Sequence, residues 1–330
     1  MLPAEASHNV ALTGMRWNHR LGLDKLVAAN IIGLAEPKEL LGLTFPHRVG
    51  LAAGLDKSAE YFDALAALGF GFVEVGTLTP RPQDGNPKPR LFRLKQDEAI
   101  INRMGFNNRG IEYGVNNLRR KKGERIVGVN IGKNFDTPVE QAADDYRLCM
   151  RACYEVADYI TVNISSPNTP GLRSLQHGDE LRSLLALLKE EQRKLQERHS
   201  CYTPMLVKLA PDLTEADIKS TCEQIMQAEM DGIIATNTTL ARTGVSDNPL
   251  AAEQGGLSGA PLSIQATEVI TQIRSEVGPQ LPLIGVGGIM SAADAKARLE
   301  AGADLLQLYS GFIYHGPELI SDILRAIHDA

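Results

Sequence analysis

From residue 49 to the end of the chain, short apolar runs alternate with longer segments in which apolar residues recur every three or four positions. The apolar runs are rich in β-branched residues and do not alternate cleanly with polar ones, which is typical of strands buried on both faces of a parallel sheet. We predict eight such strands, at Val49–Ala52, Phe70–Val75, Ile126–Ile131, Tyr159–Ile164, Met205–Leu209, Gly232–Thr236, Leu283–Val286 and Leu305–Leu308.

A helical pattern follows each of these strands. The predicted helices are Ala59–Leu68, Gly110–Lys121, Pro138–Val156, Asp179–Glu197, Glu215–Glu229, Ser263–Val277, Ala292–Ala301 and Pro317–Ile327. Eight strand–helix pairs favour closure into a (β/α)₈ TIM barrel over an open doubly wound sheet. We therefore expect an α/β protein whose barrel domain spans residues 42–330, with a small helical extension at residues 1–41.

The extension carries an amphipathic pattern that begins at Pro3 and ends at Gly22. Asp24 is positioned to cap a second apolar segment. Packing on the barrel is one interpretation, and a hydrophobic entry site for an apolar ligand at a membrane surface is the other. The pattern alone favours packing. The first apolar face comprises Ala6, Val10, Gly14, Trp17 and Leu21, and the second segment carries Leu26, Val27, Ile31 and Ile32.

A long excursion, from Leu78 to Arg109, separates the second strand from its helix. It contains a turn at Asp84-Gly85-Asn86 and a strand-like segment, Arg90–Leu94. This pattern predicts a hairpin laid over one end of the barrel.

Polar residues and glycines stand at the carboxyl ends of the predicted strands, where barrel enzymes place their sites. Glycines after the last two strands let backbone N–H groups approach an anion, so they indicate a phosphate site, although many barrels share this feature. Lys57 and Lys208 suit an anion clamp, a Schiff-base nucleophile or a partner for a cofactor. The strand-end residues include Gly54, Asp56, Lys57, Thr77, Asn130, Asn163, Lys208, Thr236, Asn237, Thr238, Gly287, Gly288, Tyr309, Ser310 and Gly311.

The loop after the fourth strand, Ser165 to Leu172, combines two serines, an asparagine, two prolines and a glycine. Prolines fix φ and Gly171 permits a sharp turn, so the loop is stiff and rich in hydrogen-bonding groups. On local pattern alone an ordinary turn is the simpler interpretation. The convergence of all the strand ends favours the placement of a small polar ligand instead.

Composition and charge exclude several classes of function. The net charge is −6 and basic residues form no long cluster, so we expect no nucleic-acid partner. The four cysteines lack metal-ligand spacing, so no metal site is expected. No run of about 18 apolar residues could span a bilayer, and the N-terminus lacks the pattern of a secretory signal.

Long motifs rich in glycine, asparagine and small polar residues stand at the strand ends and in the loops after them. They are Leu51–Lys57, Gly76–Gln83, Asn102–Asn108, Asn163–Leu172, Thr236–Thr239, Gly255–Gly259 and Gly285–Ile289. In this order they resemble the motifs of dihydroorotate dehydrogenase. The cytosolic class of that family has a cysteine where this chain has Ser166. The serine and the helical extension together resemble the membrane-associated, quinone-using class 2 enzymes.

The resemblance implies FMN at the barrel mouth and dihydroorotate or orotate stacked on its ring. By motif position, FMN would contact Ala53, Gly54, Leu55, Asp56, Lys57, Thr77, Asn130, Asn163, Lys208, Thr236, Gly259, Gly288, Tyr309 and Ser310. The substrate would be held by Lys57, Asn102, Arg103, Met104, Gly105, Phe106, Asn163, Asn168, Asn237 and Thr238. Asparagine amides both donate and accept hydrogen bonds, and a lysine can face the carboxylate of the substrate.

In the implied mechanism, Ser166 is the catalytic residue. It removes a proton from ring carbon 5 of dihydroorotate while a hydride leaves carbon 6 for flavin N5. A serine hydroxyl is a poor base without a relay, and Thr169 with an ordered water is our hypothesis for one.

Reduced FMN would then pass electrons to a membrane quinone that enters between the N-terminal helices, with Arg93 at the entrance. The reaction would serve pyrimidine biosynthesis at the cytoplasmic side of the cell membrane, in a peripheral and monomeric protein. The sequence begins almost at the first helix, whereas class 2 relatives commonly have a further amphipathic stretch before it. We therefore expect quinone reduction to survive in detergent and binding to vesicles to be weak.

Three other functions compete with this one. A cytosolic dihydroorotate or dihydropyrimidine dehydrogenase would use a different electron acceptor. A phosphosugar isomerase or aldolase would share only the barrel and its phosphate site, and would be colourless. A non-catalytic flavin-binding module would be yellow but would not be bleached by dihydroorotate.

Overall fold

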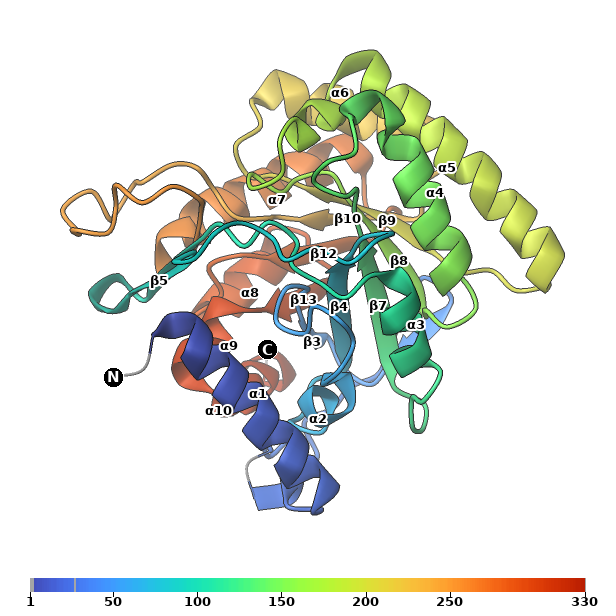
Figure 1. The fold of residues 1–330 in the computed structure, drawn as a ribbon. Helices are drawn as coiled ribbons and strands as arrows, with labels where there is room; N and C mark the ends of the chain where they lie inside the picture. The colour runs from blue at the N-terminus through green and yellow to red at the C-terminus, as the bar shows by residue number, and fades with distance from the viewer. Residues whose placement is uncertain (1–2, 27, 330) are drawn as a thin grey trace.

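The computed structural model describes residues 3–26 and 28–329, and it contains a closed barrel of eight parallel strands (Figure 1). Neighbouring strands around the barrel follow one another along the chain, as expected for repeated β–α units. The predicted TIM barrel is therefore confirmed. Its strands are β3 (Val49–Leu51), β4 (Phe72–Leu78), β7 (Ile126–Ile131), β8 (Tyr159–Asn163), β9 (Met205–Leu209), β10 (Gly232–Ala235), β12 (Leu283–Val286) and β13 (Leu305–Leu308).

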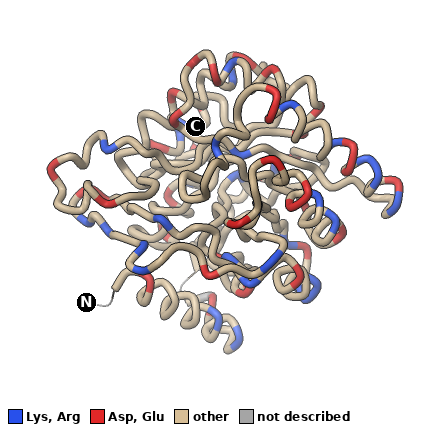
Figure 2. The backbone as a smooth tube through the Cα atoms, turned by 45° about the horizontal axis from the view of Figure 1, so that its top comes forward, with Lys and Arg blue, Asp and Glu red and all other residues tan. Residues whose placement is uncertain are grey.

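Helices cover the outside of the barrel, and each predicted helix is present with ends that differ by a few residues. A further short helix, α9 (Ser310–His315), lies between the last strand and the last helix and was not predicted. Charges of both signs are interspersed over the outer helices (Figure 2). The covering helices are α2 (Phe62–Ala66), α3 (Ile111–Leu118), α4 (Ala142–Cys153), α5 (Gly178–His199), α6 (Glu215–Gln227), α7 (Ser263–Val277), α8 (Ala292–Glu300) and α10 (Glu318–His328).

Large and small side chains alternate inside the barrel. A Cβ atom at Gly50 would lie 2.4 Å from the ring of Phe72, and one at Gly128 would lie 2.1 Å from the ring of Tyr159. The two glycines therefore make room for the two aromatic rings in the barrel interior. At the amino end of the barrel, the hairpin β1 (Lys38–Leu40) and β2 (Leu43–Phe45) places Phe45 edge-on against Phe72, with 5.1 Å between ring centroids.

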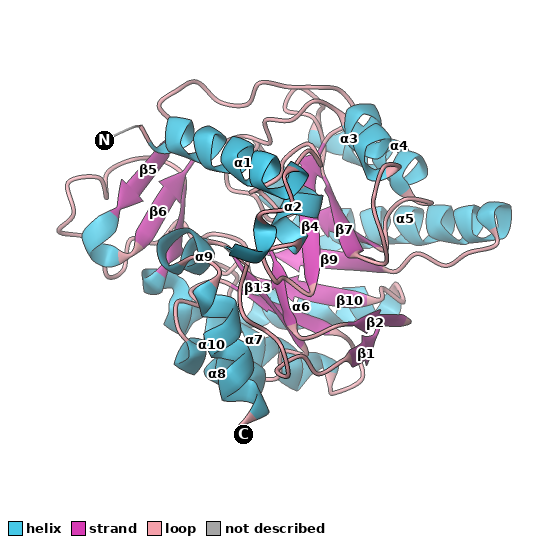
Figure 3. Ribbon diagram, turned by 90° about the horizontal axis from the view of Figure 1, so that it is seen from below, coloured by secondary structure: helices cyan, strands magenta, loops and turns pink. Residues whose placement is uncertain are grey.

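The first N-terminal helix, α1 (Ala4–Arg20), lies beside α2 and β5 (Leu91–Leu94), as Figure 3 shows. Its fully buried residue is Leu12. The apolar face that was expected to pack on the barrel faces solvent instead, with Val10, Trp17 and Leu21 exposed by 61%, 55% and 66%. The packing interpretation was therefore wrong for this face.

The second N-terminal helix was also not predicted correctly, because the structure has only a short 3₁₀ turn, Asp24–Leu26. Asp24 accepts a hydrogen bond from the ring of His19 at 2.9 Å, so its carboxylate is engaged by α1 and does not cap a new helix. Leu26 and Ile32 are exposed by 79% and 92%, and Val27 lies outside the described residues. Within residues 3–26 and 28–329, no helix is long and apolar enough to cross a membrane.

The excursion after β4 forms the predicted hairpin, from β5 and β6 (Ala99–Asn102). A third strand that was not predicted, β11 (Gly256–Gly259), pairs antiparallel with β6 and completes a small sheet. In this sheet Asn102 pairs with Gly256 and Ala99 pairs with Gly259. Segments far apart in the sequence are thereby joined over the carboxyl end of the barrel.

Candidate active site

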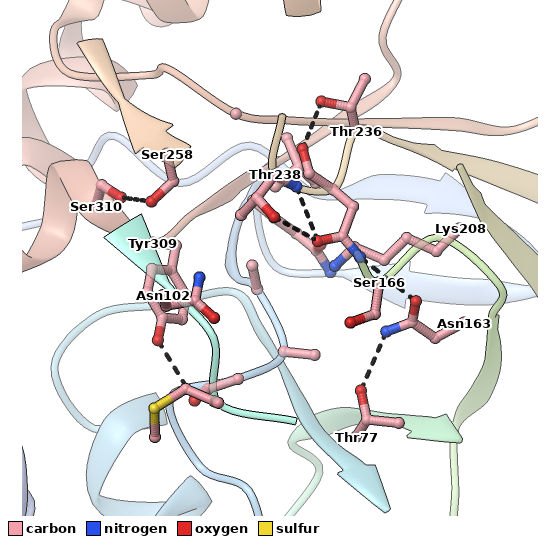
Figure 4. A pocket seen from close by; sticks show the side chains of 18 of the residues that line it. Thr77, Asn102, Asn163, Ser166, Lys208, Thr236, Thr238, Ser258, Tyr309 and Ser310 are labelled. Carbon is pink, nitrogen blue, oxygen red and sulfur yellow. Dashed lines mark hydrogen bonds between the residues drawn. The ribbon is translucent and has the colours of Figure 1, made fainter. Parts of the chain in front are cut away.

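A cavity of about 1010 Å³ opens at the carboxyl ends of the barrel strands (Figure 4). Every barrel strand except β7 ends in residues that line it, and the small sheet and the loop after β11 close it from above. Most of the predicted site residues line this one cavity. They are Ala53, Gly54, Lys57, Thr77, Asn102, Met104, Gly105, Phe106, Asn163, Ser166, Asn168, Lys208, Thr236, Asn237, Thr238, Gly259, Gly288, Tyr309 and Ser310.

Two predicted cofactor residues after β3 do not line the cavity. Leu55 is buried in the apolar core between the barrel and its helices. Asp56 is also buried, and its carboxylate accepts hydrogen bonds from the backbone N–H groups of Glu60 at 2.8 Å and Tyr61 at 2.7 Å. Burial raises the pKa of Asp56 to about 6, against these hydrogen bonds, which lower it. Its contacts are those of a residue that organises the start of α2.

Two further predicted residues lie behind the cavity wall. The guanidinium of Arg103 stacks over the ring of Phe92 at 4.7 Å and donates to Glu253 at 2.7 Å and to the carbonyl of Pro89 at 2.8 Å. It therefore ties the small sheet to a neighbouring loop. Asn130 is fully buried on β7, one layer below the cavity.

The floor of the cavity rests on a buried carboxylate that the sequence analysis did not identify. Glu74 on β4 is 0% exposed and accepts four hydrogen bonds from barrel residues. The donors are Asn130 Nδ2 at 2.8 Å, Gln307 Nε2 at 2.8 Å, the Tyr159 hydroxyl at 3.1 Å and the Thr161 hydroxyl at 3.2 Å. A buried carboxylate is stable when its oxygens are satisfied in this way.

Lys208 on β9 is the cation nearest to this carboxylate, with 3.8 Å between Nζ and Glu74 Oε1. Burial lowers the pKa of Lys208, and the Glu74 carboxylate opposes that shift. Because Lys208 lines the cavity and Glu74 lies below it, the pair presents its positive end to any ligand.

A chain of amide and hydroxyl groups runs up from the floor to the cavity wall. Asn163 Nδ2 donates to Thr77 Oγ1 at 3.1 Å (Figure 4). It also donates to Asn130 Oδ1 at 3.1 Å, and the Thr77 hydroxyl donates to the same oxygen at 2.6 Å. Asn237 Nδ2 donates to Ser165 Oγ at 2.9 Å and to Asn163 Oδ1 at 3.4 Å. These bonds fix the orientation of each amide.

The stiff loop after β8 places Ser166 in the cavity wall, 6% exposed. The Ser166 hydroxyl accepts a hydrogen bond from the backbone N–H of Asn168 at 3.3 Å. The Asn168 side chain donates to the backbone carbonyl of Asn102 at 3.2 Å, so the loop is joined to the small sheet. Thr169 is buried, and its hydroxyl has no hydrogen-bond partner among the described residues.

Lys57 stands on the opposite part of the lining, where its ammonium donates to the carbonyl of Gly54 at 2.6 Å. Burial lowers the pKa of Lys57 to about 8, and the nearby Arg90 lowers it further, while Glu5 and Asp56 raise it. Lys57 also lines a second cavity of about 790 Å³, which lies between α1 and the barrel.

A glycine-lined cradle lies beyond the carboxyl end of β12, where Gly288 and Gly259 line the cavity. A Cβ atom at Gly288 would lie 2.3 Å from the backbone nitrogen of Ser263, and one at Gly259 would lie 2.1 Å from the carbonyl oxygen of Glu98. Both glycines have positive φ, at 67° and 100°. Only glycine fits at these two positions of the wall, because any Cβ atom would meet neighbouring backbone.

Other lining residues were missed by the sequence analysis, notably Gln307 and Ser258. The Ser258 hydroxyl lies 2.8 Å from that of Ser310. Gln307 sits on an apolar strand, and Glu74 does too, so a polar residue within an apolar strand was the signal that could have found them. In the part of the chain that the structure describes, no cluster of His, Cys, Asp and Glu could hold a metal ion.

The fold and the position of the cavity define a (β/α)₈-barrel enzyme with its site at the carboxyl ends of the strands. Residues 37–330 match the family model of dihydroorotate dehydrogenase. The chain belongs to this family.

Similar proteins extend over almost the whole chain. A dihydroorotate dehydrogenase (quinone) from Nitrosospira multiformis is 55% identical over 329 residues, which cover 100% of this chain and 93% of that one. A dihydroorotate dehydrogenase (quinone) from Alkalilimnicola ehrlichii is 54% identical and covers 99% of this chain and 96% of its own. The crystal structure of the Eimeria tenella enzyme in complex with ferulenol has a TM-score of 0.89 at 37% identity, covering 98% of this chain and 90% of that one.

Proposed function

We propose that this chain oxidises dihydroorotate to orotate with bound FMN and passes the electrons to a quinone. The observation that carries the proposal is the cavity itself, in which a serine, a lysine and several asparagines surround one space at the barrel mouth. The test is an absorbance spectrum of the purified protein before and after anaerobic addition of dihydroorotate. A flavin spectrum that bleaches supports the proposal, and colourless protein or an unbleached flavin contradicts it.

The lining fits FMN at both ends of the cofactor. Gly259 and Gly288 both line the cavity, and at both a Cβ atom would meet neighbouring backbone, so the chain there stays side-chain-free and suits the phosphate. Lys208 and Gln307 line the cavity over the floor, and Gln307 Oε1 is a buried acceptor without a partner among the described residues. A donor beside a free acceptor matches the carbonyl and N–H groups on the edge of the flavin ring. When bound, FMN supplies the hydride acceptor.

The substrate would lie between the asparagines and Lys57. Asn102, Asn163, Asn168 and Asn237 offer amides that match the urea-like edge of the dihydroorotate ring. The ammonium of Lys57 would face the carboxylate of the substrate, since a charge-assisted hydrogen bond is the strongest contact available there.

Ser166 would remove the proton from ring carbon 5, because it is the hydroxyl in the wall that the stiff loop holds toward the cavity. A serine hydroxyl needs help to lose its own proton at neutral pH. Thr169, whose buried hydroxyl lacks a partner among the described residues, would pass that proton on through a water.

The quinone would enter along α1, near Arg93 on β5. The exposed apolar residues of the N-terminal segment would rest on the surface of the membrane, in a peripheral and monomeric protein. They are Val10, Trp17, Leu21, Leu23, Leu26 and Ile32.

Co-sedimentation with liposomes tests the membrane contact. A Trp17→Glu variant is expected to bind less than the wild type, while quinone reduction in detergent continues in both. Equal binding of the two proteins would contradict the assignment of this surface.

Steady-state rates with quinone, fumarate and NAD separate the proposed reaction from that of a cytosolic relative.

A further inference from the structure

The barrel interior below the cavity contains a pair of opposite charges. Glu74 on β4 is 0% exposed and Lys208 on β9 is 5% exposed, and 3.8 Å separates their charged atoms. The third titratable group here is Tyr159 on β8, whose pKa burial raises well above its ordinary value. The remaining partners of Glu74 are the neutral Asn130, Thr161 and Gln307, which reach it from β7, β8 and β13.

We propose that Glu74 is a positioning residue, which keeps Lys208 in its ammonium form and fixes the direction in which the amides around the cavity donate and accept. The inference rests on the proposed function, because Lys208 is there assigned to the flavin ring.

The first part follows from the charges. Burial in the barrel disfavours an ammonium group, and Glu74 is the charge that opposes this effect at Lys208. Without the carboxylate, the pKa of Lys208 would fall further, and the lysine would lose its proton at a lower pH than in the wild type. A neutral lysine would stabilise the negative charge of a reduced flavin less than an ammonium does.

The second part follows from hydrogen-bond roles. An ionised carboxylate only accepts, so Asn130 and Gln307 must both turn their NH₂ groups toward Glu74. The carbonyl oxygen of Asn130 is then left to accept from Thr77 and Asn163, as observed. For the same reason the Gln307 carbonyl points away from Glu74, and its oxygen is buried without a partner among the residues described.

The site is thereby given a defined polarity, with a donor at Lys208 and an acceptor at Gln307. A ring edge with adjacent C=O and N–H groups complements this donor and acceptor. An edge with two carbonyls would place a second acceptor against the Gln307 oxygen. Glu74 itself does not line the cavity, so its effect on a ligand is transmitted through its neighbours.

The test uses the holoenzyme and the nearly isosteric Glu74→Gln variant. The midpoint potential of the bound flavin is measured by dye equilibration between about pH 5.5 and 9.5. In the wild type, where Glu74 favours the ammonium form of Lys208, any step from this lysine is expected at a higher pH than in the variant. In Glu74→Gln a new step appears as Lys208 titrates, and the step is absent from the Glu74→Gln/Lys208→Met double variant. FMN binding is expected to weaken about tenfold in Glu74→Gln, because the charge-assisted contacts to the floor are lost.

Thr161→Val is the matched control. It removes one hydroxyl donor to Glu74, at 3.2 Å, and leaves both charges in place, so its potential profile should follow that of the wild type. A Glu74→Gln profile that superimposes on the wild type, at full flavin occupancy, would overturn the proposal. So would a new step in Thr161→Val.

Thermal melting keeps the proposal testable if Glu74→Gln does not fold. Lys208→Met alone leaves a buried carboxylate without its cation, so it should melt below the double variant, in which both charges are removed together. The opposite order contradicts the coupling. If the purified wild type contains no flavin but the variants melt in the expected order, the proposed function is refuted and the pairing of Glu74 with Lys208 is supported.

Discussion

The start of α1 is joined to the segment before β5 by an ion pair between Glu5 and Arg90, which a single substitution removes. Glu5 accepts from the Arg90 guanidinium at 2.7 Å through Nη2 and at 3.3 Å through Nε. Arg90 is 5% exposed and also donates to the carbonyls of Asp84 at 2.6 Å and Asn86 at 2.9 Å. Glu5→Gln should therefore loosen the helix and leave the guanidinium held in place.

The magnitude follows from the type of bond lost. A hydrogen bond to a charged group contributes about 1.5–3 kcal/mol, and the glutamine oxygen, which still accepts from the charged guanidinium, keeps about 1.5 kcal/mol, near the lower end of that range. With two contacts to Arg90 weakened, we expect a net loss of about 2 kcal/mol, which increases the open population of α1 about 30-fold. The contact of the exposed Lys88 with Glu5, at 3.4 Å, adds little.

Native-state hydrogen exchange measures this opening directly. Amide protection in α1 should fall about 30-fold in Glu5→Gln, with protection in β9 unchanged. In functional assays, flavin reduction by dihydroorotate should be retained while electron transfer to quinone slows. Lys88→Gln is the control and should leave α1 protected. Unchanged protection in α1, or an equal loss in α1 and β9, would refute the reasoning.

The same contact predicts a pH dependence. Partial burial opposes the shift, but the hydrogen bonds and charge of Arg90 lower the pKa of Glu5 below its ordinary value of 4.5. A carboxylate whose pKa is lower in the folded state than in the unfolded state stabilises the closed state fully above about pH 4.5. That stabilisation is lost as the pH falls through the folded-state pKa. Exchange in α1 should therefore increase at acid pH before the barrel unfolds.

Three further predictions concern the cavity. Lys57→Met should raise the KM for dihydroorotate about 50-fold. Because burial lowers the pKa of Lys57 to about 8, substrate binding by the wild type should weaken as the pH rises above that value. A flat KM–pH profile would contradict this. Ser166→Ala should slow flavin reduction at least about 100-fold in single-turnover stopped flow while substrate still binds, and an unchanged rate would refute its role. Gly288→Ala should lose bound flavin, measured by the absorbance ratio of the purified protein, since its Cβ would lie 2.3 Å from Ser263. Gly14→Ala, with nothing within 4 Å, is the control and should keep full occupancy.

The barrel could be predicted because its strands are mostly apolar runs without regular alternation, and four of them match the predicted bounds. The orientation of α1 could not. An amphipathic pattern identifies the apolar face of a helix but does not say what covers it, and here Trp17 and Leu21 face away from the barrel. Asp24 has the chemistry of a helix cap, yet its carboxylate pairs with His19, a contact that depends on where α1 ends.

Much of the candidate site could be predicted because its residues stand next to strand ends. Residues within one motif still point in different directions, so Asp56 turns into the core while Lys57, its neighbour, reaches the cavity. Glu74 was missed because its partners are distributed over β7, β8, β9 and β13. Only closure of the barrel brings Gln307 to a residue more than two hundred positions away.

The small sheet above the barrel connects two functions that the sequence keeps apart. Asn102, at the proposed substrate side, and Gly259, in the proposed phosphate cradle, belong to adjacent hydrogen-bonded strands. Ligands at these two places would therefore stiffen the same unit, and the first to bind would lower the ordering cost for the second. By thermodynamic reciprocity, bound flavin should raise the affinity for orotate by the same factor by which orotate raises the affinity for the flavin.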